Sequence, residues 1–164
     1  MEIKILHPTS QKIKFKPVIG EKMNDLGFRL KDFLDEDEFD SLVSETGHIL
    51  SRCSDPKLNQ EQDVTHLTVG YVQSGKTLSF TALTALAADN GYRIVIYLAG
   101  TKNNLLSQTT KRLTKDLITS SSLNNAYKIF ENPTESKILE IRNKLRLSSK
   151  PTVLITLLKH YDHI

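Results

Sequence analysis

The sequence predicts an α/β protein in which helical crossovers connect the strands of a parallel sheet. Short apolar runs alternate with longer segments whose apolar residues have helical spacing. The expected strands are residues 67–69, 94–98 and 152–157, and the expected helices are residues 78–89, 105–117 and 135–147. This alternation is typical of βαβ units, whose helices cover a parallel sheet.

The bulk composition is that of a soluble globular protein. A chain of 164 residues is long enough for one domain and too short for two full-sized α/β domains. A net charge of +3 is compatible with phosphate ligands, but it is smaller than that of a dedicated nucleic-acid binder. No stretch approaches the ~18 apolar residues of a membrane span, and no export signal begins the chain. With Cys53 as the only cysteine, we expect a cytoplasmic protein without a disulfide or a membrane partner.

Residues 1–63 are expected to form a helical and extended preface to the main domain. Residues 1–20 alternate lysine with apolar side chains, which favours a short strand or an extended arm. A helix is expected from Asp37 to Cys53, with the acidic run at residues 32–40 as its solvated first turn. A partner-docking role for this run is the alternative. Residues 54–63 are polar and predict a loop, so the second domain should be residues 64–164.

A phosphate-binding loop is predicted at residues 70–77, Gly-Tyr-Val-Gln-Ser-Gly-Lys-Thr. It matches Gly-x-x-x-x-Gly-Lys-Thr and lies between an expected strand and an Ala-rich helix. The nucleotide-binding residues that this motif predicts are Gly70, Gln73, Ser74, Gly75, Lys76 and Thr77.

The chemistry of a nucleotide triphosphate explains these residue types. Glycines let backbone amides approach the phosphate oxygens, and the helix N-terminus adds a positive dipole end. Lys76 supplies a point charge to the β- and γ-phosphates, and the hydroxyl of Thr77 holds Mg²⁺. We therefore expect ATP and Mg²⁺ as cofactors at the carboxyl edge of the sheet, with Lys76 and Thr77 as the catalytic pair. The alanines at residues 82–88 suit a helix packed closely on a sheet, and Asn90-Gly91 should end it.

A second candidate site follows the expected strand at residues 94–98. Polar residues begin the next helix there, at the edge where open parallel sheets bind ligands. Thr101, Lys102, Asn103 and Gln108 are expected to contact nucleic-acid phosphates without reading bases. An ordinary capped turn with a solvated lysine is the alternative.

Together, residues 72–77, 98–105 and 108–109 resemble superfamily two helicases, of the DEAD/DEAH-like kind. More narrowly, they are similar to helicase-like ATPases of restriction and DNA-modification systems that carry the Z-one endonuclease-associated domain. In this resemblance the loop corresponds to motif I, residues 101–108 to motif Ia, and residues 152–159 to the region near motif Ib. It implies a three-layer, RecA-like P-loop NTPase domain that hydrolyses ATP and tracks nucleic acid. The restriction systems favour DNA as the nucleic acid, although the sequence itself does not distinguish DNA from RNA.

The chain departs from that family in its acidic motif. No apolar strand ending in Asp-Glu follows the loop, and residues 158–161 before Asp162 make a poor buried strand. We therefore expect the domain to be incomplete at its C-terminal end, with the remaining helicase domains elsewhere in a longer protein, and the 164-residue chain alone to be inactive.

Two other functions remain open from the sequence. A small P-loop kinase would use the same loop, although such kinases usually begin with the loop strand. A non-catalytic nucleotide-sensing module would use the loop as a sensor and the acidic run as a docking surface. A metal site built from the histidines, such as His160 and His163, is not indicated, because no cysteine or carboxylate cluster completes it.

Overall fold

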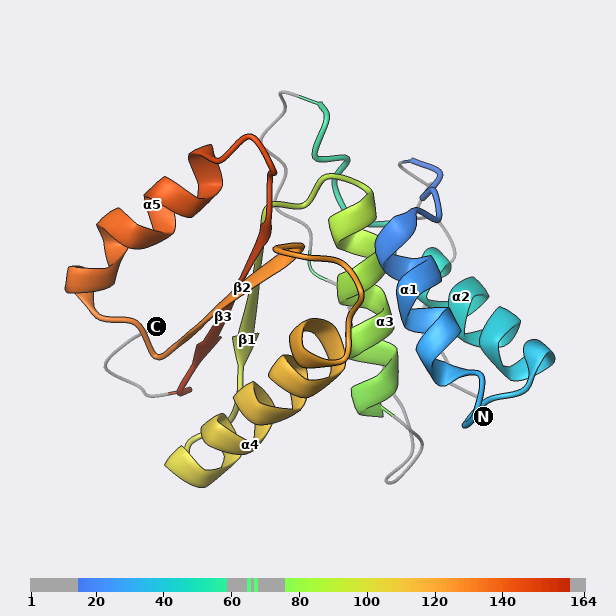
Figure 1. Cartoon of the computed structure of the whole chain (residues 1–164), viewed down its shortest axis with the longest axis horizontal. Helices are drawn as coiled ribbons and strands as arrows, with labels where there is room; N and C mark the ends of the chain where they lie inside the picture. Colours follow the sequence, from blue (N-terminus) through green and yellow to red (C-terminus); the bar gives the residue numbers. More distant parts are fainter. Residues whose placement is uncertain (1–14, 59–64, 66, 68–75, 160–164) are drawn as a thin grey trace. The chain divides into compact units, whose positions relative to one another are not determined.

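The computed structural model describes residues 15–58, 65, 67 and 76–159. The chain forms two compact units, Met1–Gly91 (unit 1) and Tyr92–Ile164 (unit 2). Figure 1 shows the three helices of unit 1 and the sheet and helices of unit 2. The boundary expected between residues 63 and 64 lies outside the described residues and stays a prediction.

The described residues of unit 1 form three helices, α1 (Glu21–Leu30), α2 (Glu36–Leu50) and α3 (Lys76–Asp89). Both α1 and α2 pack against α3. The residues that form its core are Met23 and Leu26 of α1, Leu42, Thr46 and Leu50 of α2, and Ala82, Ala85 and Leu86 of α3. Helix α1 was not predicted from the sequence, although its buried residues Met23 and Leu26 are three positions apart, as on one side of a helix.

The acidic run has the placement that the sequence predicted. Asp35 caps α2, and a reciprocal pair of hydrogen bonds joins Asp35 and Glu38. Glu36, Asp37 and Glu38 form the exposed first turn of α2, where negative charge favours the helix dipole. The helix ends at Leu50 rather than at Cys53, because the chain passes through Ser51 into a turn.

The C-terminal end of α3 holds the N-terminal end of α1. The carboxylate of Asp89 accepts hydrogen bonds from the backbone N–H groups of Gly20, Lys22 and Met23 at 2.9–3.0 Å. Its side chain is only 4% exposed, and the ammonium group of Lys22 lies 3.8 Å away. No side chain of the N-cap residue caps α1. Asp89 caps this helix instead, although it is 66–69 residues away in sequence.

Asn90 extends this attachment by one residue. Its side-chain amide accepts a hydrogen bond from the N–H of Val18 at 2.8 Å and donates to the carbonyl of Val18 at 2.9 Å. Residues 15–20, part of the predicted extended arm, lie outside any helix or strand, and the rest of that arm lies outside the described residues. The predicted stop after α3 is confirmed, because Gly91 has φ +99° and the helix ends at Asp89.

Unit 2 is an α/β unit with a three-stranded parallel sheet. Its elements are β1 (Ile94–Leu98), α4 (Asn103–Leu113), a π-helix η1 (Thr114–Thr119), β2 (Tyr127–Glu131), a 3₁₀ turn η2 (Glu135–Lys137), α5 (Ile138–Arg146) and β3 (Thr152–Leu157). The strand order is β1-β3-β2, with Ile94 beside Val153 and Lys128 beside Val153.

The expected strands at residues 94–98 and 152–157 are confirmed, as are the helices at residues 78–89 and 135–147. The helix expected at residues 105–117 is present but changes to π-helical hydrogen bonding at Thr114. The expected strand at residues 67–69 is described only at Leu67, which is 69% exposed and outside any strand. This strand therefore stays a prediction.

Helices flank the sheet of unit 2. The crossover through α4 moves from β1 past β3 to β2, and the crossover through α5 moves back from β2 to β3. Right-handed crossovers in opposite directions place their helices on opposite faces of a sheet. Figure 1 shows α4 and α5 on different sides of the strands. Val153 and Leu154, on successive positions of the central strand, are both fully buried.

One strip of the sheet remains exposed. Alternate residues of the edge strand β1, namely Ile94, Ile96 and Leu98, are exposed, the last two to 56%. The register places them on the same face as Val153, Ile155 and Leu157 of β3. The described residues of unit 2 therefore cover the centre of this face better than its β1 edge.

Replacing Asp89 with Ala should lower the free energy of unfolding by about 2–4 kcal/mol, because three amide groups lose one charged acceptor. Denaturant unfolding followed by circular dichroism measures this loss. Hydrogen exchange at the amides of Gly20, Lys22 and Met23 should accelerate at the same time. Asp35→Ala removes an exposed local cap and should cost only about 1 kcal/mol. Equal losses in the two variants would contradict the role given to Asp89.

Candidate functional site

The phosphate-binding motif leads into the start of a helix. α3 begins at Lys76, so Thr77 lies in its first turn, and the carbonyl of Thr77 accepts a hydrogen bond from the hydroxyl of Thr81 at 3.0 Å. Gly70, Gln73, Ser74 and Gly75, together with the side chain of Lys76, lie outside the described residues. The helical half of the predicted strand-loop-helix pattern is therefore present, and the nucleotide site itself stays a prediction.

The alanine-rich sequence of α3 makes it a buried helix. Ala82, Ala85, Ala87 and Ala88 are all buried, and so are Thr81 and Thr84. The two threonine hydroxyls donate to carbonyls one turn earlier in the helix. The buried hydroxyl of Ser79 makes no hydrogen bond to the described residues. A helix with mostly small side chains can be enclosed without large cavities.

The carboxyl ends of the three strands of unit 2 lie at one edge of the sheet. The chain after β1 is joined to the chain after β3, because the N–H of Lys159 donates to the carbonyl of Gly100 at 2.7 Å. The N–H of Asn132, after β2, donates to the carbonyl of Thr156 at 2.7 Å. Open parallel sheets bind ligands outside this edge. The predicted location of a site after β1 is consistent with this geometry.

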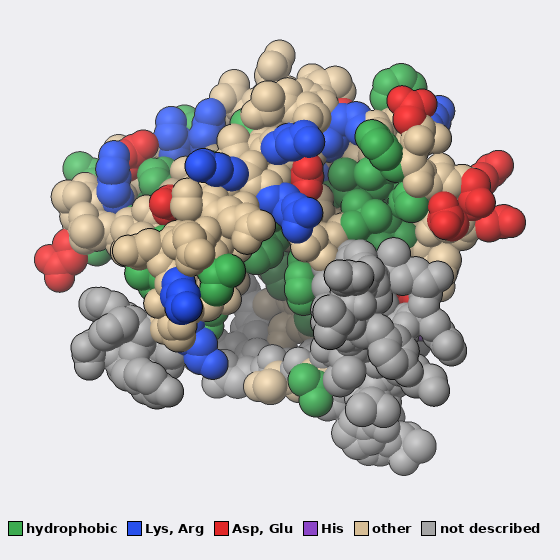
Figure 2. All heavy atoms as spheres, turned by 90° about the horizontal axis from the view of Figure 1, so that it is seen from below, with side chains coloured by type: hydrophobic (Ala, Val, Ile, Leu, Met, Phe, Trp, Pro, Cys, Tyr) green, Lys and Arg blue, Asp and Glu red, His purple; other side chains and the backbone are tan. Residues whose placement is uncertain are grey.

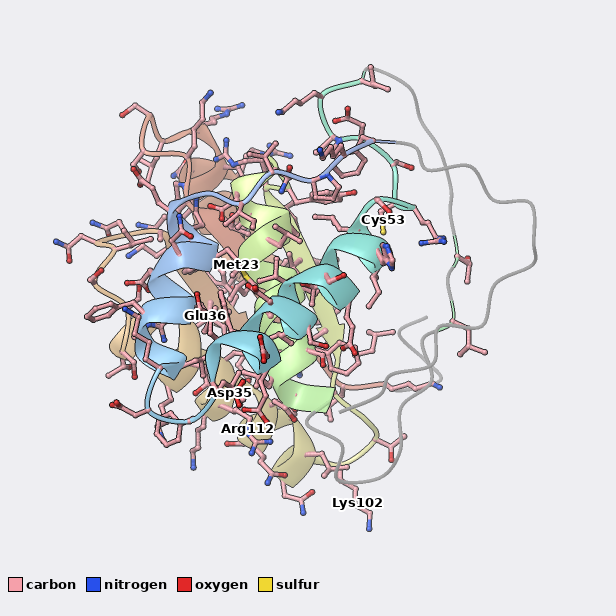
Figure 3. The ribbon with its side chains drawn as sticks, turned by 90° about the vertical axis from the view of Figure 1, so that its right-hand side faces the viewer. Met23, Asp35, Glu36, Cys53, Lys102 and Arg112 are labelled. Atoms are coloured by element: carbon pink, nitrogen blue, oxygen red, sulfur yellow. The ribbon has the colours of Figure 1, made fainter. Side chains whose placement is uncertain are left out.

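The residues predicted for nucleic-acid binding begin at this edge. Gly100 turns the chain with φ +92°, and Thr101, Lys102 and Asn103 are all exposed. Figure 2 shows several Lys and Arg side chains on one face of the molecule. Figure 3 shows the side chain of Lys102 extending away from the ribbon. Lys102 is the N-cap residue of α4, and its side chain is exposed.

Gln108 is exposed but lies farther along α4 than the other three residues. It is one turn beyond Asn104, whose side-chain oxygen accepts from the N–H of Leu105 at 2.9 Å. The structure thus brings Thr101, Lys102 and Asn103 together at the junction, and it places Gln108 on the outer side of the helix.

A hydroxyl pair fixes α4 to the central strand. The hydroxyls of Thr110 and Thr156 lie 2.7 Å apart, and Thr156 is fully buried. Leu106 and Leu113 of α4 are buried as well. Since this side of α4 is held against the sheet, the opposite side is presented outward.

Several basic residues near these positions were not predicted from the sequence. Lys159 is exposed just after β3, beside the junction. Lys111, Arg112 and Lys115 are exposed on α4 and η1. Lys115 follows Lys111 by four residues and Arg112 by three, and this helical spacing was the signal that could have identified them.

Among the described residues, no group of three or more His, Cys, Asp or Glu side chains could hold a metal ion. Cys53 is half-buried, and its thiol donates to the carbonyl of Ile49 at 3.6 Å. His160, Asp162 and His163 lie outside the described residues. Within the same described part, no helix is long and apolar enough to cross a membrane.

Comparisons with protein-family models, curated proteins and solved structures found no match for this chain.

Replacing Lys102 and Gln108 together with Ala should weaken binding of single-stranded and duplex nucleic acid at low salt. Contacts to phosphates imply a strong salt dependence with little preference for sequence. Fluorescence anisotropy with labelled oligonucleotides of two unrelated sequences measures both properties. Lys137→Ala, on the 3₁₀ turn of the same unit, is a control. An unchanged affinity of the double variant would contradict the predicted surface.

Proposed function

We propose that this chain is the ATP-binding N-terminal part of a helicase-like, nucleic-acid-dependent ATPase that serves DNA restriction, modification or defence. The observation that carries the proposal is the Gly-x-x-x-x-Gly-Lys-Thr motif whose lysine is the first residue of α3. A glycine-containing loop that ends at a helix N-terminus is the arrangement that phosphate groups require.

In the proposed site each part of the motif has its own task. Backbone amides from Gln73 to Thr77 surround the phosphates, while the ammonium group of Lys76 neutralises the β- and γ-phosphates. The hydroxyl of Thr77 holds the Mg²⁺ that accompanies ATP. The macrodipole of α3 stabilises the same negative charge.

Nucleic acid enters the proposal through unit 2. Lys102 and its polar neighbours are exposed at the carboxyl edge of a parallel sheet, where the helix α4 begins. Exposed lysine, hydroxyl and amide groups bind a phosphate backbone without selecting a base sequence. This pairing of a nucleotide loop with a backbone-contacting surface suits an enzyme that moves along nucleic acid.

A nucleotide-sensing interaction module is the second candidate. It is favoured by the packing of α1 and α2 on α3, the helix that starts at the phosphate loop. The exposed acidic start of α2 would then be the partner-docking surface. Binding of Mg²⁺-ATP without stimulation by nucleic acid in any longer form of the protein would favour this candidate.

Replacing Lys76 with Ala should reduce affinity for Mg²⁺-ATP at least about tenfold, because the phosphates lose their point charge. Titration calorimetry with Mg²⁺-ATP and Mg²⁺-ADP measures the loss. Lys102→Ala is the matched control and should leave nucleotide affinity unchanged. Equal affinities in the wild type and in Lys76→Ala would remove the phosphate loop from the proposal.

Hydrolysis by the 164-residue chain should be negligible even where ATP binds. Turnover also needs an acidic group to orient water and an arginine to stabilise transition-state charge, and a missing arginine finger alone costs on the order of 10³-fold or more. A phosphate-release assay with and without single-stranded DNA tests this expectation. Rapid turnover that Lys76→Ala abolishes would show that the chain carries a complete catalytic site.

A further inference from the structure

The outer side of α4 and η1 contains a shallow, open hollow with a volume of about 750 Å³. We call it the α4 hollow. The residues that line it are Asn104, Ser107, Gln108, Lys111, Arg112, Lys115 and Asp116. Six of these seven were outside the predicted nucleic-acid surface, which shared only Gln108 with the hollow.

Helix periodicity explains why these residues share one surface. Leu106, Leu113 and Leu117 are buried and face the core of unit 2. At about 3.6 residues per turn, the stripe from Asn104 through Lys111 to Lys115 falls on the opposite side of the helix. Five of the lining residues are exposed, and Ser107 and Asp116 are half-buried.

The charge of the α4 hollow is positive. Lys111, Arg112 and Lys115 stand against one carboxylate, that of Asp116. The remaining lining groups are a hydroxyl and two side-chain amides, which donate and accept hydrogen bonds. Lys102 lies at the start of α4 and Arg112 in its last turn, both in unit 2, and Figure 3 labels both side chains. The basic surface thus continues from the strand-end junction along the helix.

The C-terminal residues of this stripe lie on the π-helix η1. η1 continues α4 directly at Thr114 and carries Lys115 and Asp116 into the hollow. π-helical turns are rare and are frequently found at functional sites. This geometry is an observation independent of the charge.

We propose that the α4 hollow binds the phosphodiester backbone of a nucleic-acid strand. The proposal rests on the proposed function and extends its nucleic-acid surface from Lys102 along the whole of α4. From Asn104 to Lys115 the helix rises about 16 Å at 1.5 Å per residue. The three cations lie within the last five residues of that length, about 6 Å of rise, and the polar groups that precede them supply contacts to phosphate and sugar oxygens.

The open shape of the hollow favours this ligand over a free nucleotide, and the burial of α4 disfavours a membrane. A free nucleotide is usually held in an enclosed pocket, whereas this hollow is open. A membrane-binding helix inserts an exposed apolar side into the lipid, whereas the apolar side of α4 is buried in unit 2.

The test compares two triple variants of the full chain that remove equal charge. Lys111→Gln, Arg112→Gln and Lys115→Gln together neutralise the hollow while keeping long side chains. Arg142→Gln, Lys144→Gln and Arg146→Gln together neutralise α5 and serve as the control. Fluorescence anisotropy measures the affinity of each variant for single-stranded DNA, duplex DNA and RNA of the same sequence. The measurements are repeated at salt concentrations from about 50 to about 200 mM.

Neutralising the hollow should weaken single-strand binding at least about tenfold at the lowest salt. The slope of log K against log salt should fall by about 2, since each phosphate contact on a single strand contributes roughly 0.7. The double variant Lys111→Gln and Lys115→Gln keeps Arg112 and should lower the slope by about 1.4. Circular dichroism of each variant checks that the fold is retained. The α5 variant should change the slope by less than about 0.5.

Other outcomes overturn the proposal in distinguishable ways. If the hollow variants behave like the α5 control while Lys102→Ala with Gln108→Ala still weakens binding, the α4 hollow is not used and the proposed function stands. If the wild-type chain binds neither single strands nor duplexes at low salt, both are overturned. If Lys111, Arg112 and Lys115 matter only for binding phosphatidylserine vesicles, the ligand is a membrane surface and the proposal is wrong.

Discussion

The arrangement of unit 1 depends on one buried carboxylate. Asp89 ends α3, where a negative charge opposes the helix dipole, so its position there needs compensation. Three backbone N–H groups at the start of α1 supply it, and Lys22 adds an ion pair. In return, the orphan donors of α1 are satisfied without a local cap. The helix that begins at the phosphate loop is therefore attached to the N-terminal segment at its other end, about 20 Å away along its axis.

The sequence predicted the strongly periodic elements and missed those that depend on distant partners. α3, β1 and β3 have continuous apolar patterns with clear ends, and each was predicted nearly to the residue. α1 was missed because its cap, Asp89, is far away in sequence. β2 was missed because Lys128 interrupts its apolar run, although a strand between two crossover helices is what a parallel sheet requires. Asn125 and Asn132 flank β2 with φ 59° and 41°, a conformation that asparagine tolerates, so its ends were marked in the sequence.

In the candidate site, too, some residues could be predicted from the sequence and others depend on distant strand pairing. The junction after β1 could be predicted because the carboxyl ends of parallel strands all lie at the same edge of the sheet. Thr101, Lys102 and Asn103 are exposed at this edge. Lys159 could not be predicted as their neighbour, because that proximity depends on β3 pairing beside β1. The register of a parallel pair is set by side-chain packing across the sheet, which no short motif encodes. A motif therefore identifies one strand end, and only the topology shows which other strand end lies beside it.

One side of α4 packs against the sheet, and the opposite side carries the basic residues of the α4 hollow. The hydroxyl of Thr156 on the central strand accepts or donates one hydrogen bond with Thr110, which fixes the rotation of α4 about its axis. Buried leucines on the same side reinforce that rotation by removing apolar surface from water. Once the rotation is fixed, the basic side chains of Lys111, Arg112 and Lys115 must face outward, whatever they bind. Their direction follows from packing, and their long side chains cost little to keep solvated. A change that weakens the attached side of α4 would therefore also move the basic side, so variants of Thr110 or Thr156 are unsuitable as neutral controls for ligand binding.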